Sequence, residues 1–249
     1  MAAKQKIYAT IEARMTSTRL PGKVLMESVG KPMLELMVER LKRISCLDGI
    51  VIATTVNDSD DCVAELARNQ GVDCYRGSEN DVMSRILEAA RKHQIDIIVE
   101  TTGDCPLIDP EIVEKVIRTY LDSGADYVSN VIERTFPWGM DTEVFSRETL
   151  EDAASRTDDP VDHEHVSVFL WRNPQIYKLV NVPAPFDLAN PDLRLTLDTR
   201  EDFRVIDEIF STLYPQNPEF SLADILELIR KRPEISEFNR HIQQKKLSE

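Results

Sequence analysis

The chain has 249 residues, of which 42% are hydrophobic and 30% are charged, and its formal net charge is −14. This length predicts one large domain, or one domain with a small appendage, and the hydrophobic fraction is sufficient for a substantial core. An acidic surface repels nucleic acid, and no apolar run approaches the roughly 20 residues of a membrane span, so we expect no nucleic-acid partner and no membrane partner. The chain opens on polar residues that lead into a strand, which favours a cytoplasmic location over export.

Residues 1–124 alternate between two kinds of pattern. Short apolar runs predict strands at residues 7–13, 50–56, 72–76 and 95–101. Amphipathic spacing and capping residues predict helices at residues 33–44, 58–70, 81–93 and 109–121. This alternation predicts an α/β fold, a Rossmann-like and mostly parallel sheet with helices on both faces.

From residue 125 onward the alternation is less regular. Strands are predicted at residues 127–131, 140–145, 176–182 and 193–197. Helices are predicted at residues 147–155, 163–171, 201–213 and 222–230. Three prolines between residues 183 and 192 predict a loop. We expect the later strands to extend the same sheet with a small additional arm, so that residues 1–249 form a single domain.

The most informative motif lies between the first strand and the first helix, at residues 13–23. It combines three cations, Arg14, Arg19 and Lys23, with three hydroxyls and one glycine. Small residues let backbone N–H groups approach an anion, hydroxyls add donors and cations neutralise charge, and a triphosphate needs all of these together. The spacing matches neither a Walker A motif nor Gly-x-Gly-x-x-Gly. The alternative interpretation is a solvated basic turn. Such a turn seldom combines hydroxyls, Pro-Gly and a buried strand that precedes it.

Two aspartates each follow an apolar strand pattern and precede a helix. Asp104 follows residues 95–101, and Asp198 follows residues 193–197. Ligands of open α/β sheets bind beyond the carboxyl ends of the strands, which places Asp104 beside the cationic loop. Because Mg²⁺ takes one or two carboxylates together with substrate phosphates, the pair predicts a Mg²⁺ site. The alternative is that each is a helix N-cap, and this alternative is weaker for Asp104 because Asp109 already precedes the next helix.

These segments resemble motifs of the CMP-sugar-type cytidylyltransferases, such as the KDO and sialic-acid cytidylyltransferases. The likeness is greatest to the spore-coat polysaccharide SpsF-like branch. Residues 13–23 resemble the signature loop, residues 103–108 the Gly-Asp-x-Pro-Leu-Ile motif, and residues 197–202 the Asp-Thr-x-Glu-Asp motif. The resemblance implies a nucleotidyltransferase domain with a nucleotide-binding half, residues 1–124, and an acceptor-binding half, residues 125–249, that adds the second metal ligand.

The resemblance also implies roles for individual residues. Asp104 and Asp198 bind Mg²⁺, and the catalytic cations that stabilise charge on the phosphates are Arg14, Arg19 and Lys23. The nucleotide contacts are Ala13, Arg14, Ser17, Arg19, Lys23, Arg76, Ser78, Asp81 and Asp104.

Residues 75–81 allow two interpretations. The segment resembles the part of these enzymes that faces the base, in which Arg76 and Ser78 approach the cytosine or ribose. It also fits an ordinary turn in which Asp81 is a helix N-cap. Both interpretations stay open.

We expect the acceptor to be bound by residues of the second half. The candidates are Asp141, Glu143, Glu164, His165 and Arg194. Asp141 and Glu143 alternate, so both face one side of a strand, and the Glu164–His165 pair resembles a Glu-His-Val segment of the SpsF-like branch. A helix-cap or core role for His165, and an ion pair between Arg194 and Asp192, are the alternatives.

The reaction implied is attack of an acceptor hydroxyl on the α-phosphorus of CTP, with pyrophosphate as the leaving group. The leading interpretation is CMP transfer to a sugar acid for surface polysaccharide. A polyol, a glycerate-like acid or a phosphonate is an alternative acceptor. A GT-A glycosyltransferase would want an Asp-x-Asp metal motif, and Asp58-Ser59-Asp60 has those letters but begins a predicted helix. The resemblance implies a homodimer.

Overall fold

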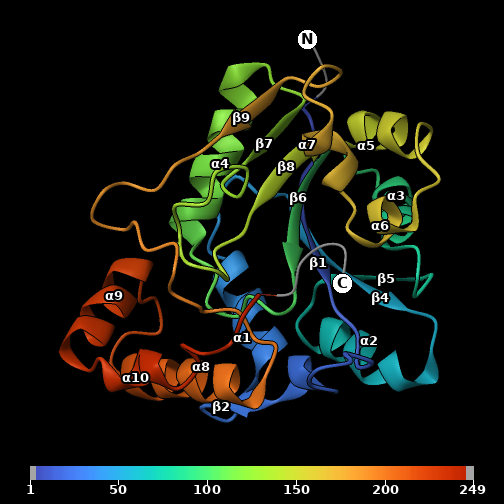
Figure 1. Ribbon diagram of the computed structural model, residues 1–249. Helices are drawn as coiled ribbons and strands as arrows, with labels where there is room; N and C mark the ends of the chain where they lie inside the picture. The colour runs from blue at the N-terminus through green and yellow to red at the C-terminus, as the bar shows by residue number, and fades with distance from the viewer. Residues whose placement is uncertain (1–3, 245–249) are drawn as a thin grey trace.

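The computed structural model describes residues 4–244. Within them, a seven-stranded sheet runs through the molecule in the order β5-β4-β1-β6-β8-β7-β9 (Figure 1). Its strands are β1 (Ile7–Glu12), β4 (Gly49–Thr55), β5 (Asp73–Gly77), β6 (Ile97–Thr102), β7 (Tyr127–Ser129), β8 (Glu143–Ser146) and β9 (Leu179–Asn181). All neighbours pair in parallel except β8, which is antiparallel to β6 and β7. The predicted mostly parallel sheet is therefore confirmed, and both halves of the chain supply strands.

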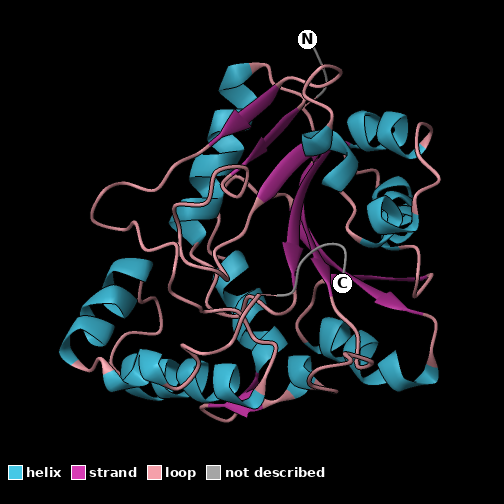
Figure 2. Ribbon diagram, in the orientation of Figure 1, coloured by secondary structure: helices cyan, strands magenta, loops and turns pink. Residues whose placement is uncertain are grey.

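Helices cover both faces of this sheet (Figure 2). On one face lie α1 (Met33–Leu41), α2 (Asp61–Asn69) and α4 (Pro110–Ser123). On the other lie α3 (Val82–His93), α5 (Arg147–Ala154) and α7 (Val168–Arg172), while α6 (Pro160–Glu164) packs against α3. The central strands β1, β4 and β6 are almost fully buried, as expected of a parallel sheet covered on both faces, while the edge strands β5 and β9 are partly buried. Of the helices within residues 4–244, none is long and apolar enough to cross a membrane.

Besides the apolar clusters on the two faces of the sheet, a further apolar cluster lies below the sheet edge and contains the C-terminal helices (Figure 1). These helices are α8 (Arg200–Leu213), α9 (Leu222–Lys231) and α10 (Glu234–Glu237). They pack with Leu36 of α1 and with Leu195 and Leu197, which are fully buried. This packing carries the segment before α8 across to the carboxyl ends of the strands.

Two short elements complete the chain between β1 and α1. A 3-10 turn spans Lys23–Leu25, and a small hairpin pairs β2 (Glu27–Ser28) with β3 (Lys31–Pro32). A second 3-10 turn, Asp58–Asp60, precedes α2. The segment 183–192 is a loop, as its prolines predict, and Figure 1 shows it swinging out between β9 and α8.

Two predicted elements differ in the structure. Residues 193–197 form only an isolated bridge, between Trp138 and Arg194, and not a strand of the sheet. These residues are apolar because they are buried against α8, and not because they pair with a strand of the sheet. The predicted helix 163–171 is divided into α6 and α7, because Val166 between them has a φ of +47°. A glycine usually adopts this conformation, so a β-branched residue in it interrupts the helix without the usual sequence signal.

Candidate active site

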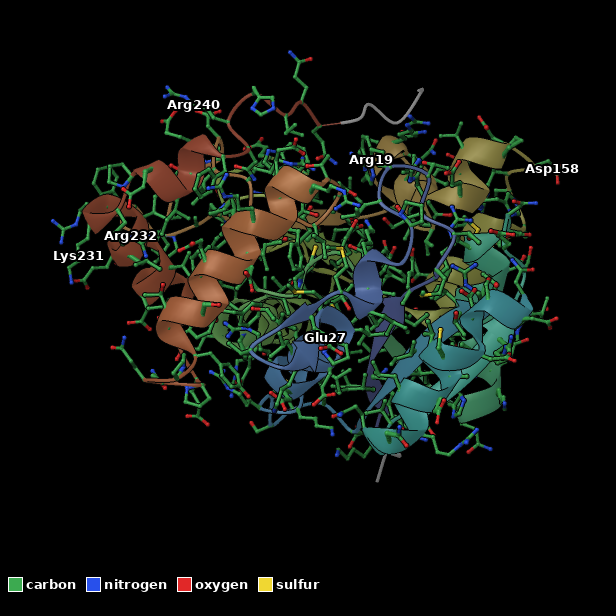
Figure 3. All side chains as sticks on the ribbon, turned by 90° about the horizontal axis from the view of Figure 1, so that it is seen from below. Arg19, Glu27, Asp158, Lys231, Arg232 and Arg240 are labelled. Atoms are coloured by element: carbon green, nitrogen blue, oxygen red, sulfur yellow. The ribbon has the colours of Figure 1, made fainter. Side chains whose placement is uncertain are left out.

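A cleft of about 260 Å³ opens at the carboxyl ends of β1 and β6. Many of the predicted site residues line it, and they come from both halves of the chain. They are Ala13, Arg14, Ser17, Arg19, Lys23, Asp104, Glu164, His165 and Asp198. Figure 3 shows Arg19 on the loop that follows β1, seen from below. The topology that places β1 beside β6 thus brings the predicted cationic loop and the predicted carboxylates to one site.

The loop after β1 is held in place by an aspartate that we did not predict as part of the site. The buried Asp60 accepts a hydrogen bond of 2.7 Å from Met15 N, and its other oxygen accepts one from the Thr55 hydroxyl. Gly22, at a φ of +73°, closes the loop by donating to Met15 O at 2.9 Å. The Asp-x-Asp letters at residues 58–60 therefore anchor the cationic loop, which leaves the glycosyltransferase interpretation without its metal motif.

Glu79, in the turn before α3, braces the same loop from the other side. Its carboxylate accepts hydrogen bonds from Arg14 at 3.2 Å, from Thr16 at 2.5 Å and from Asn57 at 2.7 Å. These bonds hold the pKa of Glu79 below its usual value. The Arg14 guanidinium is about one-third exposed, so it is fixed at one end and open toward the cleft.

Gly103 allows the loop after β6 to approach the loop after β1. Its N–H donates to Glu12 O at 2.8 Å. A Cβ atom at this position would lie 2.9 Å from Glu12 O, closer than real Cβ contacts come, and 3.2 Å from Ala13 Cβ, which is tighter than most of them. A glycine here therefore sets how near Asp104 comes to the cationic loop.

The centre of the site is an ammonium between two carboxylates. Lys23 Nζ lies 3.0 Å from Asp104 Oδ2 and 2.8 Å from Asp198 Oδ1, and Arg19 lies 2.8 Å from the same Asp198 oxygen. Burial lowers the pKa of Lys23, but the two aspartates outweigh it and raise that pKa above its usual value. Burial likewise raises the pKa of Asp104, but Lys23 and the Thr102 hydroxyl hold it below its usual value.

The structure separates these two aspartates from helix capping. The N-cap of α4 is Asp109, whose side chain accepts from Glu111 N at 2.8 Å. The N-cap of α8 is Thr199, which forms a capping box with Asp202. The N-cap interpretation is therefore wrong for Asp104 and for Asp198, and both carboxylates face cations.

A buried network holds Asp198 from behind. The guanidinium of Arg194, which is 5% exposed, donates to Asp198 Oδ2 at 2.8 Å and to both oxygens of Asp202 at 2.8 and 3.1 Å. Asn239 donates to Asp202 at 2.9 Å and to Arg194 O at 3.0 Å. Leu197 N donates to Asp104 O at 2.7 Å and joins the two carboxylate segments. Arg194 is thus not among the residues that line the cleft, and its partners are Asp198 and Asp202, where the alternative named Asp192.

The predicted base-facing residues lie beside the cleft and outside its lining. Arg76 donates to the carbonyls of Thr55 at 2.8 Å and Asn57 at 2.7 Å. Asp81 is the N-cap of α3, and its N–H donates to Ser78 Oγ at 3.0 Å. The turn interpretation thus describes this segment, and contact with the base stays a prediction.

The predicted acceptor residues divide into two groups. Glu164 and His165, at the end of α6, line the cleft. Asp141 instead pairs with both guanidinium nitrogens of Arg134 at 2.7 and 2.8 Å, and Glu143 accepts hydrogen bonds from hydroxyls on β7 and before α7. Burial raises the pKa of Glu143. Neither Asp141 nor Glu143 lines the cleft, and an acceptor contact by either stays a prediction.

Two charged residues that line the cleft were not predicted as site residues. Glu12 ends the buried strand β1, and Arg85 projects from α3 and is 2% exposed. Arg85 donates to the carbonyl oxygens of Ser78 and Glu79, and so fixes the turn before α3. A carboxylate at the carboxyl end of a buried strand was a signal present in the sequence, because Asp104 was identified by the same reasoning.

The donor set fits Mg²⁺. The carboxylates of Asp104 and Asp198 both contact the Lys23 ammonium, so they converge on one point, and carboxylate oxygens are the ligands that Mg²⁺ prefers. Within residues 4–244 no group of three or more His, Cys, Asp or Glu gathers as metal ligands. Two carboxylates suit an ion that keeps waters and substrate phosphates as its other ligands.

Comparison with known proteins agrees with this geometry. The family model described as cytidylyltransferase matches residues 8–247. The spore coat polysaccharide biosynthesis protein SpsF of Bacillus subtilis is 32% identical over 234 residues, which cover 92% of this chain and 95% of that protein. The 3-deoxy-manno-octulosonate cytidylyltransferase of Geobacter metallireducens is 28% identical over 242 residues, with 86% and 94% covered. A solved cytidylyltransferase structure from Leptospira borgpetersenii is 36% identical, has a TM-score of 0.89, and is matched over 98% of this chain and 100% of its own. The chain therefore belongs to the cytidylyltransferase family.

Proposed function

We propose that this protein transfers CMP from CTP to a hydroxyl of a sugar acid or a related hydroxy acid, with release of pyrophosphate, for surface polysaccharide biosynthesis. One observation carries the proposal. Three cations of the loop after β1 line the same cleft as two carboxylates that contact one ammonium. This arrangement suits a nucleoside triphosphate with a bound divalent cation. The polysaccharide role rests on the likeness to SpsF.

The loop residues and the two aspartates have separate roles in this reaction. Arg14, about one-third exposed, and the loop hydroxyls face the triphosphate, because Asp60 and Glu79 hold the loop open toward the cleft. Lys23 and Arg19 stabilise charge on the phosphates as pyrophosphate leaves. Asp104 and Asp198 would hold Mg²⁺, which supplies charge neutralisation at the phosphates and lowers the pKa of the attacking hydroxyl when bound.

Arg19 and Lys23 now contact the aspartates, and nucleotide binding gives them new partners. Both cations reach Asp198, and Lys23 also reaches Asp104. Bound phosphates would give Arg19 and Lys23 anionic partners, and Asp104 and Asp198 would then be available to hold a divalent cation. No net charge has to be buried without a partner in either state, which suits a site that fills and empties in each cycle.

The acceptor enters from the side of α6. Glu164 and His165 line that side, and α6 is tied to α3 by the 2.9 Å contact between His163 and Asp81. The acceptor candidates that line the cleft are therefore these two residues. The lining also includes Arg85, whose positive charge suits an acid group of the acceptor.

Pyrophosphate release tests the proposal. The purified protein is incubated with Mg²⁺, one of CTP, UTP, ATP or GTP, and a panel of sugar acids, hydroxy acids, polyols and phosphonates. We expect release that requires CTP together with one acceptor class, and no release with Asp104→Asn. Acceptor-dependent release that prefers UTP or a purine nucleotide would refute the base assignment. Consumption of a nucleotide sugar in place of CTP would refute the reaction.

A further inference from the structure

His163 lies between two hydrogen-bond acceptors, and this arrangement fixes its charge. Its Nδ1 lies 2.9 Å from Asp81 Oδ1, and its Nε2 lies 3.0 Å from the carbonyl oxygen of Thr157. Asp81 already accepts hydrogen bonds at both oxygens, from the N–H and the hydroxyl of Ser84, so it is a carboxylate and donates nothing. A neutral imidazole has one N–H and could satisfy only one of the two acceptors. The contacts therefore require the imidazolium form of His163, in which both nitrogens donate.

The charges around His163 favour this form. The hydrogen bond with Asp81 raises the pKa of His163 above its usual value, and a backbone carbonyl and the charge of Asp158 act in the same direction against burial. The helices that pack against α6 are α3 and α7. Their cations have acceptors of their own, because Arg85 of α3 donates to backbone carbonyls and Arg172 of α7 pairs with an α6 carboxylate at 3.6 Å.

The imidazolium joins α6 to segments that are separate in the chain. Thr157 lies between α5 and α6, and Asp81 is the N-cap of α3, 82 positions before His163. With five residues, α6 is too short to be stable by itself. Val166, fully buried just after α6, has a φ of +47°, which costs a β-branched residue conformational energy. Tertiary contacts must therefore hold this segment in place, and His163 supplies two of them.

Glu164 and His165 follow His163 directly, and both line the cleft. We infer that the His163 imidazolium is a positioning residue that holds this wall of the cleft against α3, so that the acceptor binds more weakly when the charge is lost. The inference rests on the proposed CMP transfer and adds to it a charge that controls acceptor binding. CTP binding should be independent of that charge, because Asp60 and Glu79 hold the cationic loop.

The sign of the pH dependence follows from the raised pKa of His163. The charge is fully present below about pH 6.5, the ordinary value for histidine, and it is lost as pH rises through the raised pKa. The KM for the acceptor should therefore be lowest at the acidic end of the range and increase with pH. The increase should be about tenfold, because a neutral ring keeps only one of its two hydrogen bonds.

Steady-state kinetics of three variants test the inference. The KM for CTP and the KM for the sugar acid or hydroxy acid that supports pyrophosphate release are measured between pH 6 and 9. His163→Gln carries no charge, so its acceptor KM should be raised about tenfold throughout. His163→Arg stays charged and has several donors, so it should keep the low KM at every pH. His241→Gln is the matched control at an exposed histidine outside the cleft lining, and it should match the wild type.

A second measurement needs no substrate. The chain has four histidines, so nitrogen-15 NMR of histidine-labelled protein can assign His163 by the signal that is missing from His163→Gln. Both ring nitrogens of His163 should be protonated at pH 6, and the midpoint of their titration should lie above about 6.5. This titration, together with the kinetics of His163→Arg, keeps the inference testable if His163→Gln fails to fold.

Three results would overturn the inference. They are a wild-type acceptor KM for His163→Gln at pH 6, a KM for His163→Arg that rises with pH as in the wild type, and a titration midpoint of His163 at or below about 6.5. If His163 titrates as expected but no acceptor supports pyrophosphate release, the proposed function fails. The role of His163 in acceptor binding then fails with it, while its charged contact between α6 and α3 stands.

Discussion

Replacing Arg194 with alanine should destabilise the fold by about 3 kcal/mol. Arg194 is 5% exposed and is the cation between Asp198 and Asp202, which are 2% and 0% exposed. Removing one partner of a buried ion pair typically costs about 3–5 kcal/mol, because a charge is left buried without compensation. The loss falls at the lower end here. Asp202 keeps three N–H donors, from Asp198, Thr199 and Asn239, and Asp198 keeps its two loop cations.

Urea unfolding measures this loss. With a slope of about 3 kcal/mol per molar urea for a chain of this size, the midpoint should fall by about 1 M. Arg194→Lys keeps the charge but not the forked geometry, so its urea midpoint should lie between those of the wild type and Arg194→Ala. Arg156→Ala is the matched control, since Arg156 forms an exposed ion pair with Asp152 just beyond the end of α5 and its loss should leave the midpoint unchanged. If Arg194→Ala has the wild-type urea midpoint and a raised KM for the acceptor, Arg194 does not stabilise the fold through Asp198 and Asp202. It would then belong to the acceptor site.

Three further predictions concern the site and its surroundings. Lys23→Ala should lower turnover about 10²-fold in a pyrophosphate-release assay while circular dichroism stays unchanged, and near-normal turnover would mean that the loop does not bind the phosphates. Asp104→Asn should abolish Mg²⁺-dependent turnover without unfolding the protein, and an active variant with unchanged Mg²⁺ dependence would remove Asp104 from the metal site. The hydrogen bond with Asp81 raises the pKa of His163, so the stability that it adds should be fully present below about pH 6.5 and be lost as pH rises through the raised pKa. The difference in Tm between wild type and His163→Gln should therefore shrink with rising pH, and a difference independent of pH would contradict this.

The sheet and the cationic loop were predictable because their signals are local. Apolar runs of strand length and a cluster of cations with hydroxyls can be recognised within a dozen residues, and the parallel order then places Asp104 beside Lys23. Capping signals are local too: Asp109 is the N-cap of α4 as expected, and Asp81, for which a cap was one of two open interpretations, is the N-cap of α3.

What the sequence did not reveal depends on contacts between distant segments. Asp60 supports Met15 across 45 positions, and this contact exists only because β1 pairs with β4. Arg194 has an aspartate two positions away, yet its partners lie four and eight positions on, where α8 begins. The break at Val166 has no sequence signal, because its positive φ is imposed by the packing around it.

In the proposed reaction, one cleft joins CMP from CTP to an acceptor hydroxyl. The most direct measurement is ³¹P NMR of a complete reaction with CTP, Mg²⁺ and the acceptor that supports pyrophosphate release. We predict that each CTP consumed yields one pyrophosphate and one phosphodiester between CMP and the acceptor, and that Asp198→Asn yields neither. Formation of CDP and inorganic phosphate, or of free CMP without a phosphodiester, would contradict the account.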